Sequence, residues 1–209
     1  MSHDIRTPHE RHHRLYHTGD QQYRRQGAGE DYLAKTLASS NHLLSLINDV
    51  LDMSRIESGK IQLDETEVNL SDVLHDIKTI VSGQFYAKQL ELYMDAIDIT
   101  DEDVYCDKTR LNQILMNLLS NAIKFTPAGG TIRFGVERLG PEVEVSIWNS
   151  GQGISPEALP YVFQRFYKED QSRGLHARGA GLGLNICKVL VNLSGGQIRV
   201  ESKQGEWCR

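Results

Sequence analysis

Two glycine clusters near the C-terminal end constrain the backbone of this 209-residue chain most strongly. The first occupies residues 149–154 and the second residues 179–184. Because glycine lets a backbone turn sharply and approach an anion closely, such clusters beside apolar sequence are typical of phosphate-binding loops. The stretch between them carries the cationic residues Lys168, Arg173 and Arg178. We therefore expect a basic segment that closes between two glycine hinges over phosphates.

The net charge and the cysteine spacing indicate which cellular compartment and which classes of partner the chain favours. The net charge of −5 argues against a general attraction to nucleic acid or to an anionic membrane. The three cysteines show neither zinc-site spacing nor a disulfide framework, which fits a reducing cytoplasm. No apolar run approaches the ~20 residues that span a bilayer. We expect a cytoplasmic chain without nucleic-acid or membrane contacts of its own, although a longer parent could be anchored through a preceding region.

Apolar periodicity predicts four helices. The strongest pattern covers residues 31–58, where apolar residues follow a near-heptad seam: Leu33, Leu37, Leu44, Ile47 and Leu51. Further patterns predict helices over 70–88, 108–125 and 183–193. The expected buried face of residues 70–88 is Val73, Ile77, Ile80 and Val81. The expected buried set of residues 108–125 is Leu111, Ile114, Leu115, Leu118, Leu119 and Ala122.

Short alternating segments predict the strands. Strands are expected over residues 90–94, 103–106, 131–138, 143–148 and 197–202. The third and fourth of these flank Gly140-Pro141, so we expect them to be antiparallel neighbours. Helices and strands segregated in this way favour an α+β fold, with a helical hairpin before an α/β sandwich.

Four blocks follow one another in a fixed order along the chain. They are residues 2–8, residues 117–125, the first glycine cluster with the following segment 163–166, and the second glycine cluster. In these blocks and their order the chain resembles the transmitter region of sensor histidine kinases. The resemblance implies a dimerisation and histidine-phosphotransfer hairpin over residues 1–62. It also implies an ATP-binding catalytic domain of the histidine kinase/Hsp90-like type over residues 63–209.

The first block would carry the phospho-acceptor. An imidazole such as that of His3 can attack the γ-phosphorus of ATP as a neutral nucleophile. The resemblance implies that Asp4 accepts a proton or orients His3, and that Thr7, one helical turn later, helps water to dephosphorylate the partner regulator. It further implies autophosphorylation on His3, phosphoryl transfer to an aspartate of a response-regulator receiver domain, and homodimerisation through the hairpin.

The second block places three polar residues on one helix face. Asn117, Asn121 and Lys124 stand at i, i+4 and i+7. A carboxamide oxygen is the hard donor that Mg²⁺ prefers. By resemblance, Asn121 is the Mg²⁺ ligand, whereas Asn117 and Lys124 contact the phosphates. A solvated polar stripe on an amphipathic helix is the alternative for these residues.

The glycine clusters supply the remaining candidates for nucleotide contact. Backbone N–H groups at a helix start suit phosphate oxygens. By resemblance, the nucleotide-binding set also includes Gly151, Gly153, Lys168, Gly179, Gly181, Leu182 and Gly183. Phe163 and Phe166 are expected to be core anchors of the basic segment. A helix cap in an ordinary loop would explain the second cluster equally well.

Asn149 departs from the pattern of the family. The family usually has aspartate at this position, where its carboxylate accepts a hydrogen bond from the adenine amino group. An asparagine oxygen can still accept, but it loses the charge that roughly doubles the strength of such a bond. We therefore predict weaker ATP binding at Asn149, by about 1–3 kcal/mol.

Residues 9–29 also depart from the pattern, because they lack the apolar periodicity of a hairpin helix. One hypothesis is a compensated frameshift, since a shifted reading of possible codons from residue 9 gives an apolar helical pattern. The alternative is a metal site, because His9, His13 and His17 are spaced i, i+4, i+8 as Zn²⁺ or Ni²⁺ ligands can be. Neighbouring arginines, which repel cations, and the lack of an apparent carboxylate second shell weaken the metal interpretation.

Both ends of the chain look cut relative to the family. Residue 1 directly precedes the phospho-acceptor block, and the sequence stops where the family continues into a last strand. We expect the catalytic domain to lack that strand and to expose a sheet edge. Two other functions therefore stay open: an inactive nucleotide-binding or dimerisation fragment of a histidine kinase, and an ATPase of the same fold without phosphorelay.

Overall fold

The computed structural model describes residues 32–33, 36–37, 39–40, 43–44, 46–97, 103–169 and 180–209. The chain divides into two compact units, Met1–Asn48 and Asp49–Arg209. The described residues of the first unit are helical, as the near-heptad seam predicts, and their apolar side chains Leu33, Leu37 and Leu44 are exposed. The same helical conformation continues into the second unit as far as Glu57.

The second unit alternates helices and strands. In chain order its elements are β1 (Thr66–Asn69), α2 (Leu70–Lys88), β2 (Glu91–Ile97), β3 (Asp103–Cys106), α3 (Lys108–Phe125), β4 (Thr131–Leu139), β5 (Glu142–Ser150), the 3₁₀ turn η1 (Leu159–Tyr161), α4 (Gly183–Leu193), β6 (Ser202–Lys203) and β7 (Trp207–Cys208). The predicted bounds of α2, α3 and α4 are confirmed. The strand predicted over 197–202 is wrong except at its last residue, where β6 begins.

Two sheets form within this unit. β1 and β3 make a two-stranded antiparallel sheet, whereas the larger sheet has the order β2-β4-β5-β7-β6. β4 and β5 are antiparallel neighbours as expected, with Phe134 opposite Ile147. β2, however, pairs with β4 in parallel, with Met94 opposite Phe134. The larger sheet is therefore mixed. Parallel pairing is possible because α3 lies between β2 and β4 in the chain and carries the backbone back to the end of the sheet where β2 began.

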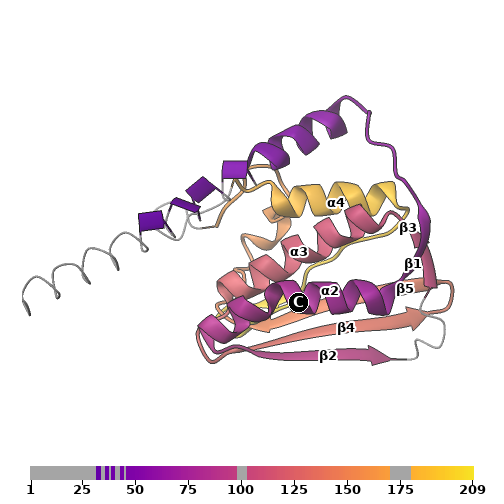
Figure 1. Ribbon diagram of the computed structural model, residues 1–209. Coiled ribbons are helices and arrows are strands. Elements are labelled where there is room, and N and C mark those ends of the chain that lie inside the picture. Colours follow the sequence, from indigo (N-terminus) through magenta and orange to yellow (C-terminus); the bar gives the residue numbers. More distant parts are fainter. Residues whose placement is uncertain are drawn as a thin grey trace, which may run out of the picture. The chain divides into compact units, whose positions relative to one another are not determined.

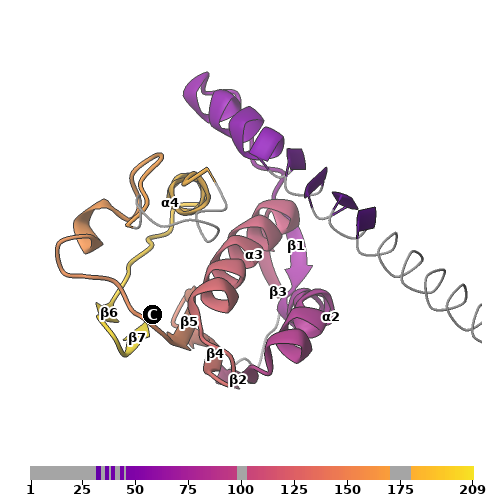
Figure 2. The ribbon, with the colours of Figure 1, turned by 90° about the vertical axis from the view of Figure 1, so that its left-hand side faces the viewer.

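The core lies between this sheet and the helices. Figures 1 and 2 show α2 and α3 side by side on one face of β2, β4 and β5, with α4 next to α3. Alternate residues of β4, namely Ile132, Phe134 and Val136, are almost fully buried against the two helices. Val73 and Ile77 of α2 pack into the same cluster. The arrangement confirms the α+β fold class.

Local capping fixes where α2 and α3 begin. The Asn69 side chain accepts a hydrogen bond from the Asp72 backbone N–H, and the Asp107 side chain accepts one from the Arg110 N–H. Ile80 is an exception to the predicted buried face of α2, because its side chain is 59% exposed. Within the described residues, every helix is too short or too polar to traverse a lipid bilayer.

Candidate functional site

The polar face of α3 meets the start of α4. A Cβ atom added to Gly183, the first residue of α4, would lie 3.7 Å from Cγ of Asn117. The Nδ2 atom of Asn117 is buried and faces the sulfur of Cys187, whose pKa the Asn117 amide lowers against the larger opposite effect of burial. Sulfur is a weak hydrogen-bond acceptor, so this position favours a stronger oxygen acceptor brought by a ligand.

The N-terminus of α4 differs from those of the other two α-helices, α2 and α3. Asn69 caps α2 and Asp107 caps α3, whereas Leu182 precedes α4 without a side-chain cap. The first backbone N–H groups of α4 therefore meet no capping side chain, and they lie beside the amide of Asn117. Uncapped N–H groups and the positive end of a helix dipole together suit a phosphate.

Two cations lie at the C-terminal end of α3. Burial lowers the pKa of the Lys124 ammonium, and the positive charge of Lys168 lowers that pKa further. This electrostatic effect joins two residues that stand 44 positions apart in the sequence. An ammonium group that burial and a nearby cation both disfavour suits a polyanionic ligand, because the charge of such a ligand offsets both effects.

Asn149 lies on β5 against the end of α3. Only 6% of Asn149 is exposed. A Cβ atom added to Gly151 would lie 2.5 Å from the carbonyl oxygen of Phe125 and 2.9 Å from Nδ2 of Asn149. Gly151 is therefore required for the close approach of this loop to α3. The buried Asn149 amide thus lies next to this loop, which contacts the C-terminal end of α3.

Gly153 and Gly181 have backbone conformations that favour glycine. Their φ angles are +61° and +73°, in the left-handed region. A Cβ atom on Gly153 would collide with the carbonyl oxygen of Lys203, and one on Gly181 would lie 2.9 Å from the backbone of Phe166. Both glycines therefore serve tight backbone contacts in the structure, and neither one needs a ligand to explain its presence.

One expectation about side chains in this region needs correction. Phe166 is not a core anchor, because its side chain is 67% exposed and its φ angle is +61°. Its backbone N–H instead donates a 2.9 Å hydrogen bond to the carbonyl oxygen of Gly181. Leu182 is 1% exposed and packs with Ile186 and Leu190, so only its backbone is placed to meet a ligand.

Some candidate residues lie outside the described part of the chain. They are the phospho-acceptor residues His3, Asp4 and Thr7, the glycine Gly179, the basic residues Arg173 and Arg178, and the atypical segment 9–29 with its histidines. Their predicted roles stay predictions.

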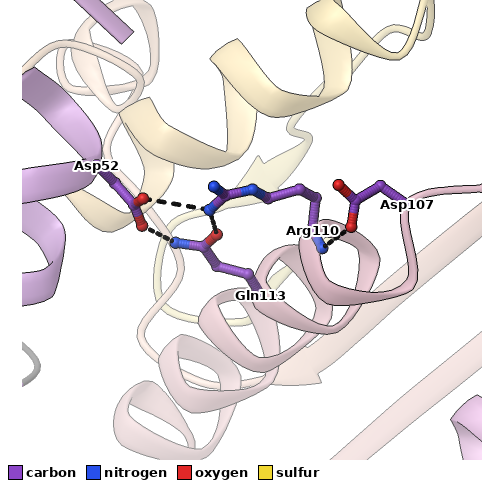
Figure 3. A network of polar contacts seen from close by, with 4 residues as sticks. All are labelled: Asp52, Asp107, Arg110 and Gln113. Atoms are coloured by element: carbon purple, nitrogen blue, oxygen red, sulfur yellow. Dashed lines mark hydrogen bonds and ion pairs between the residues drawn. The ribbon is translucent and has the colours of Figure 1, made fainter. Parts of the chain in front are cut away.

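Sequence reasoning missed a polar network that joins the helix ending at Glu57 to α3 (Figure 3). Arg110 donates from Nη1 to Oδ1 of Asp52 at 3.2 Å and to Oε1 of Gln113 at 2.9 Å. Gln113 donates from Nε2 to Oδ2 of Asp52 at 2.7 Å, which closes the ring. The side chains of Arg110 and Asp52 are 18% and 12% exposed. No local pattern marks these residues, since Asp52 and Arg110 are 58 positions apart.

A second set of contacts joins the same helix to α4 and its preceding segment. Glu57 forms an ion pair with Arg165. Ile56 and Ile61 pack against the cluster of Leu182, Ile186 and Leu190. The residues that follow Asp49 are thus tied to both elements that carry the candidate phosphate contacts.

Comparison with known families and proteins gives the same assignment. Residues 106–209 match the family model described as histidine kinase-, DNA gyrase B-, and HSP90-like ATPase. The chain is 41% identical over 182 residues to the sensor protein GacS of Pseudomonas syringae pv. syringae, covering 84% of this chain and 20% of GacS. This chain thus spans about a fifth of the length of that relative.

Solved structures of sensor kinases have the same fold. Full-length ShkA in complex with AMPPNP superposes with a TM-score of 0.72 at 29% identity, covering 86% of this chain and 38% of ShkA. Histidine kinase ThkA in complex with the response regulator protein TrrA superposes with a TM-score of 0.62 at 27% identity, covering 81% of this chain and 47% of ThkA.

Proposed function

Since this chain belongs to the sensor histidine kinases and carries their nucleotide-binding catalytic domain, we propose that it binds ATP with Mg²⁺ and phosphorylates its own His3. The observation that carries the proposal is the uncapped start of α4 beside the buried amide of Asn117, which has only a weak sulfur acceptor in Cys187. A phosphate oxygen placed there would accept from both, because it is a stronger acceptor than a thiol and the α4 N–H groups meet no capping side chain.

The other candidate residues fit a triphosphate that lies along α3. Lys124 and Lys168 would offset the phosphate charge, and Gly151, Gly153, Gly179, Gly181, Leu182 and Gly183 would shape the backbone around it. The base would lie against Asn149, whose amide oxygen accepts from the adenine amino group. Asn121 is half-buried on the same helix and offers a carboxamide oxygen, which suits it to hold Mg²⁺. Bound Mg²⁺ neutralises charge on the phosphates.

The chemistry proposed for the whole protein is phosphoryl transfer to histidine. A neutral ring nitrogen of His3 attacks the γ-phosphorus, the bond from that phosphorus to its bridging oxygen breaks, and ADP leaves. Asp4 accepts the imidazole proton or orients the ring, and Thr7 positions the water that later removes phosphate from the regulator. Positioning and charge neutralisation supply most of the acceleration in such transfers.

The proposed acceptor of the phosphoryl group is an aspartate in a response-regulator receiver domain. The similarity to ThkA, which was solved with the response regulator protein TrrA, supports a partner of this class. Homodimerisation through the hairpin is proposed from the exposed apolar seam of Leu33, Leu37 and Leu44.

The buried amide of Asn149 favours a second candidate function. A nearly buried carboxamide in place of the charged acceptor supports weak ATP binding, and thus a nucleotide-binding fragment without kinase activity. A phosphorelay-free ATPase is the third candidate, and it would hydrolyse ATP steadily without becoming labelled.

Labelling with γ-³²P-ATP and Mg²⁺ tests the proposal, with His3→Ala as the control. Acid-labile, alkali-stable label that disappears in His3→Ala is the expected result. Nucleotide binding without label would contradict kinase activity and favour the inactive fragment. Steady release of phosphate without label would favour the ATPase.

A further inference from the structure

The last two turns of the long helix belong to the nucleotide-binding unit. We call residues 49–57 the helix end, and they fall within the compact unit Asp49–Arg209. We call residues 163–167 together with residues 180–190 the glycine block, because the second segment contains Gly181 and Gly183. The helix end contacts α3 on one side and the glycine block on the other.

The contact with α3 is a closed ring of polar side chains near the first turn of that helix. Asp52 accepts from both Arg110 and Gln113, and Arg110 also donates to Gln113 (Figure 3). Asp52 itself is 9% exposed, so its charge is largely removed from water and depends on these donors. The ring therefore resists separation of the helix end from α3.

The contact with the glycine block combines charge with apolar packing. Glu57 pairs with Arg165, while Ile56 packs against the cluster formed by Leu182, Ile186 and Leu190.

The block is held together internally, because its two parts exchange hydrogen bonds. Phe166 donates from its backbone N–H to the carbonyl oxygen of Gly181 at 2.9 Å. Asn185 donates from Nδ2 to the carbonyl oxygen of Phe163 at 2.8 Å. The segment that carries Arg165 is therefore hydrogen-bonded directly to Gly181 and to α4.

We propose that the helix end is a brace that fixes the nucleotide site, with Asp52 and Glu57 as positioning residues. The inference rests on the proposed function, in which α3 supplies Asn117 and Lys124 and the glycine block supplies backbone N–H groups. Because the helix end contacts both α3 and the glycine block, it fixes the distance between them before ATP binds. Such preorganisation strengthens binding. α3 and α4 also pack directly through Ile114, so the brace tunes the affinity and is not required for binding.

Thermodynamic linkage makes the coupling between docking of the helix end and nucleotide binding reciprocal. If the docked helix end strengthens nucleotide binding by some factor, bound nucleotide must favour docking of the helix end by the same factor.

Glu57→Gln is the variant that tests the brace. The Glu57 and Arg165 side chains are 56% and 43% exposed, so losing their ion pair should leave the melting temperature of the nucleotide-free chain almost unchanged. The dissociation constant for ATP should nevertheless rise about two- to fivefold, the range that an exposed ion pair can supply. Asp76→Asn is the matched control, because Asp76 is 57% exposed, pairs with Lys108 and lies on α2 away from the site.

Two further measurements separate positioning from general damage. The charge swap Glu57→Arg with Arg165→Glu should restore much of the ATP affinity that either single change removes. Hydrogen exchange of the full chain should show slower exchange across residues 49–57 when ATP is added.

The outcomes distinguish the brace from the proposed function. The brace would be refuted, and the proposed function would stand, if the wild-type chain bound ATP tightly, Glu57→Gln bound it equally well, and ATP did not slow hydrogen exchange in the helix end. A wild-type chain that binds no nucleotide would refute the proposed function and the brace together.

Discussion

Replacing Asp52 by alanine should cost the second unit about 2 kcal/mol of unfolding free energy. The change leaves Nε2 of Gln113 without its 2.7 Å acceptor and removes the carboxylate from Arg110. Breaking a fully buried ion pair costs about 3–5 kcal/mol. The partial exposure of both side chains and the 3.2 Å separation of the pair place this case below that range. Asp52→Asn should cost about half as much, because the amide keeps one acceptor for Gln113.

Urea denaturation measures this loss. Trp148 and Trp207, the two tryptophans of the chain, lie on β5 and β7, so their fluorescence reports unfolding of the sheet. A loss of 2 kcal/mol corresponds to a melting temperature lower by about 4–8 °C for a unit of this size. Asp76→Ala, at an exposed 3.8 Å pair, should cost less than about 0.5 kcal/mol. If Asp52→Ala proved as mild as Asp76→Ala, the ring in Figure 3 would not hold the helix end to α3.

Three further predictions concern ligand binding and pH. Asn149→Asp should tighten ATP binding about tenfold, since a charged acceptor would face the adenine amino group, whereas ITP, which lacks that group, should gain nothing in the same calorimetric titration. Lys124→Gln should weaken ATP binding about tenfold, because it removes a cation that burial and Lys168 already make costly to charge; equal affinities in a fluorescent-nucleotide displacement assay would contradict this role. Burial raises the pKa of the Asp107 carboxyl, but backbone N–H donors at Arg110, Asp64 and Thr109 outweigh it, so the folded pKa lies below the usual value. The native state then binds fewer protons than the unfolded state, and this contribution is present above pH ~4 and lost as pH falls through the folded pKa. Asp107→Asn should therefore lower stability at pH 7 and flatten the loss below pH 4 in acid titrations followed by circular dichroism.

The sequence predicted the helices closely because their signals are local. Helices 70–88, 108–125 and 183–193 begin and end where expected, since capping residues and apolar stripes act within one or two turns. Ile80 was assigned to the wrong face, because it sits at the edge of the stripe that Val73 and Ile77 define. The roles of Lys124 and Lys168 as phosphate contacts, which came from the order of the four blocks, stay predictions.

Contacts between distant segments depended on the tertiary structure. The parallel pairing of β2 with β4, the burial of Asn149 beside Gly151, and the exposure of Phe166 each depend on where remote backbone segments meet. The ring of Asp52, Arg110 and Gln113 has no sequence signature at all, because an aspartate on one helix and an arginine on another are ordinary surface residues until packing removes them from water. The sequence alone thus determined the elements and the chemistry available to them. The tertiary structure decided which groups meet, because burial and pairing depend on the arrangement of the whole chain.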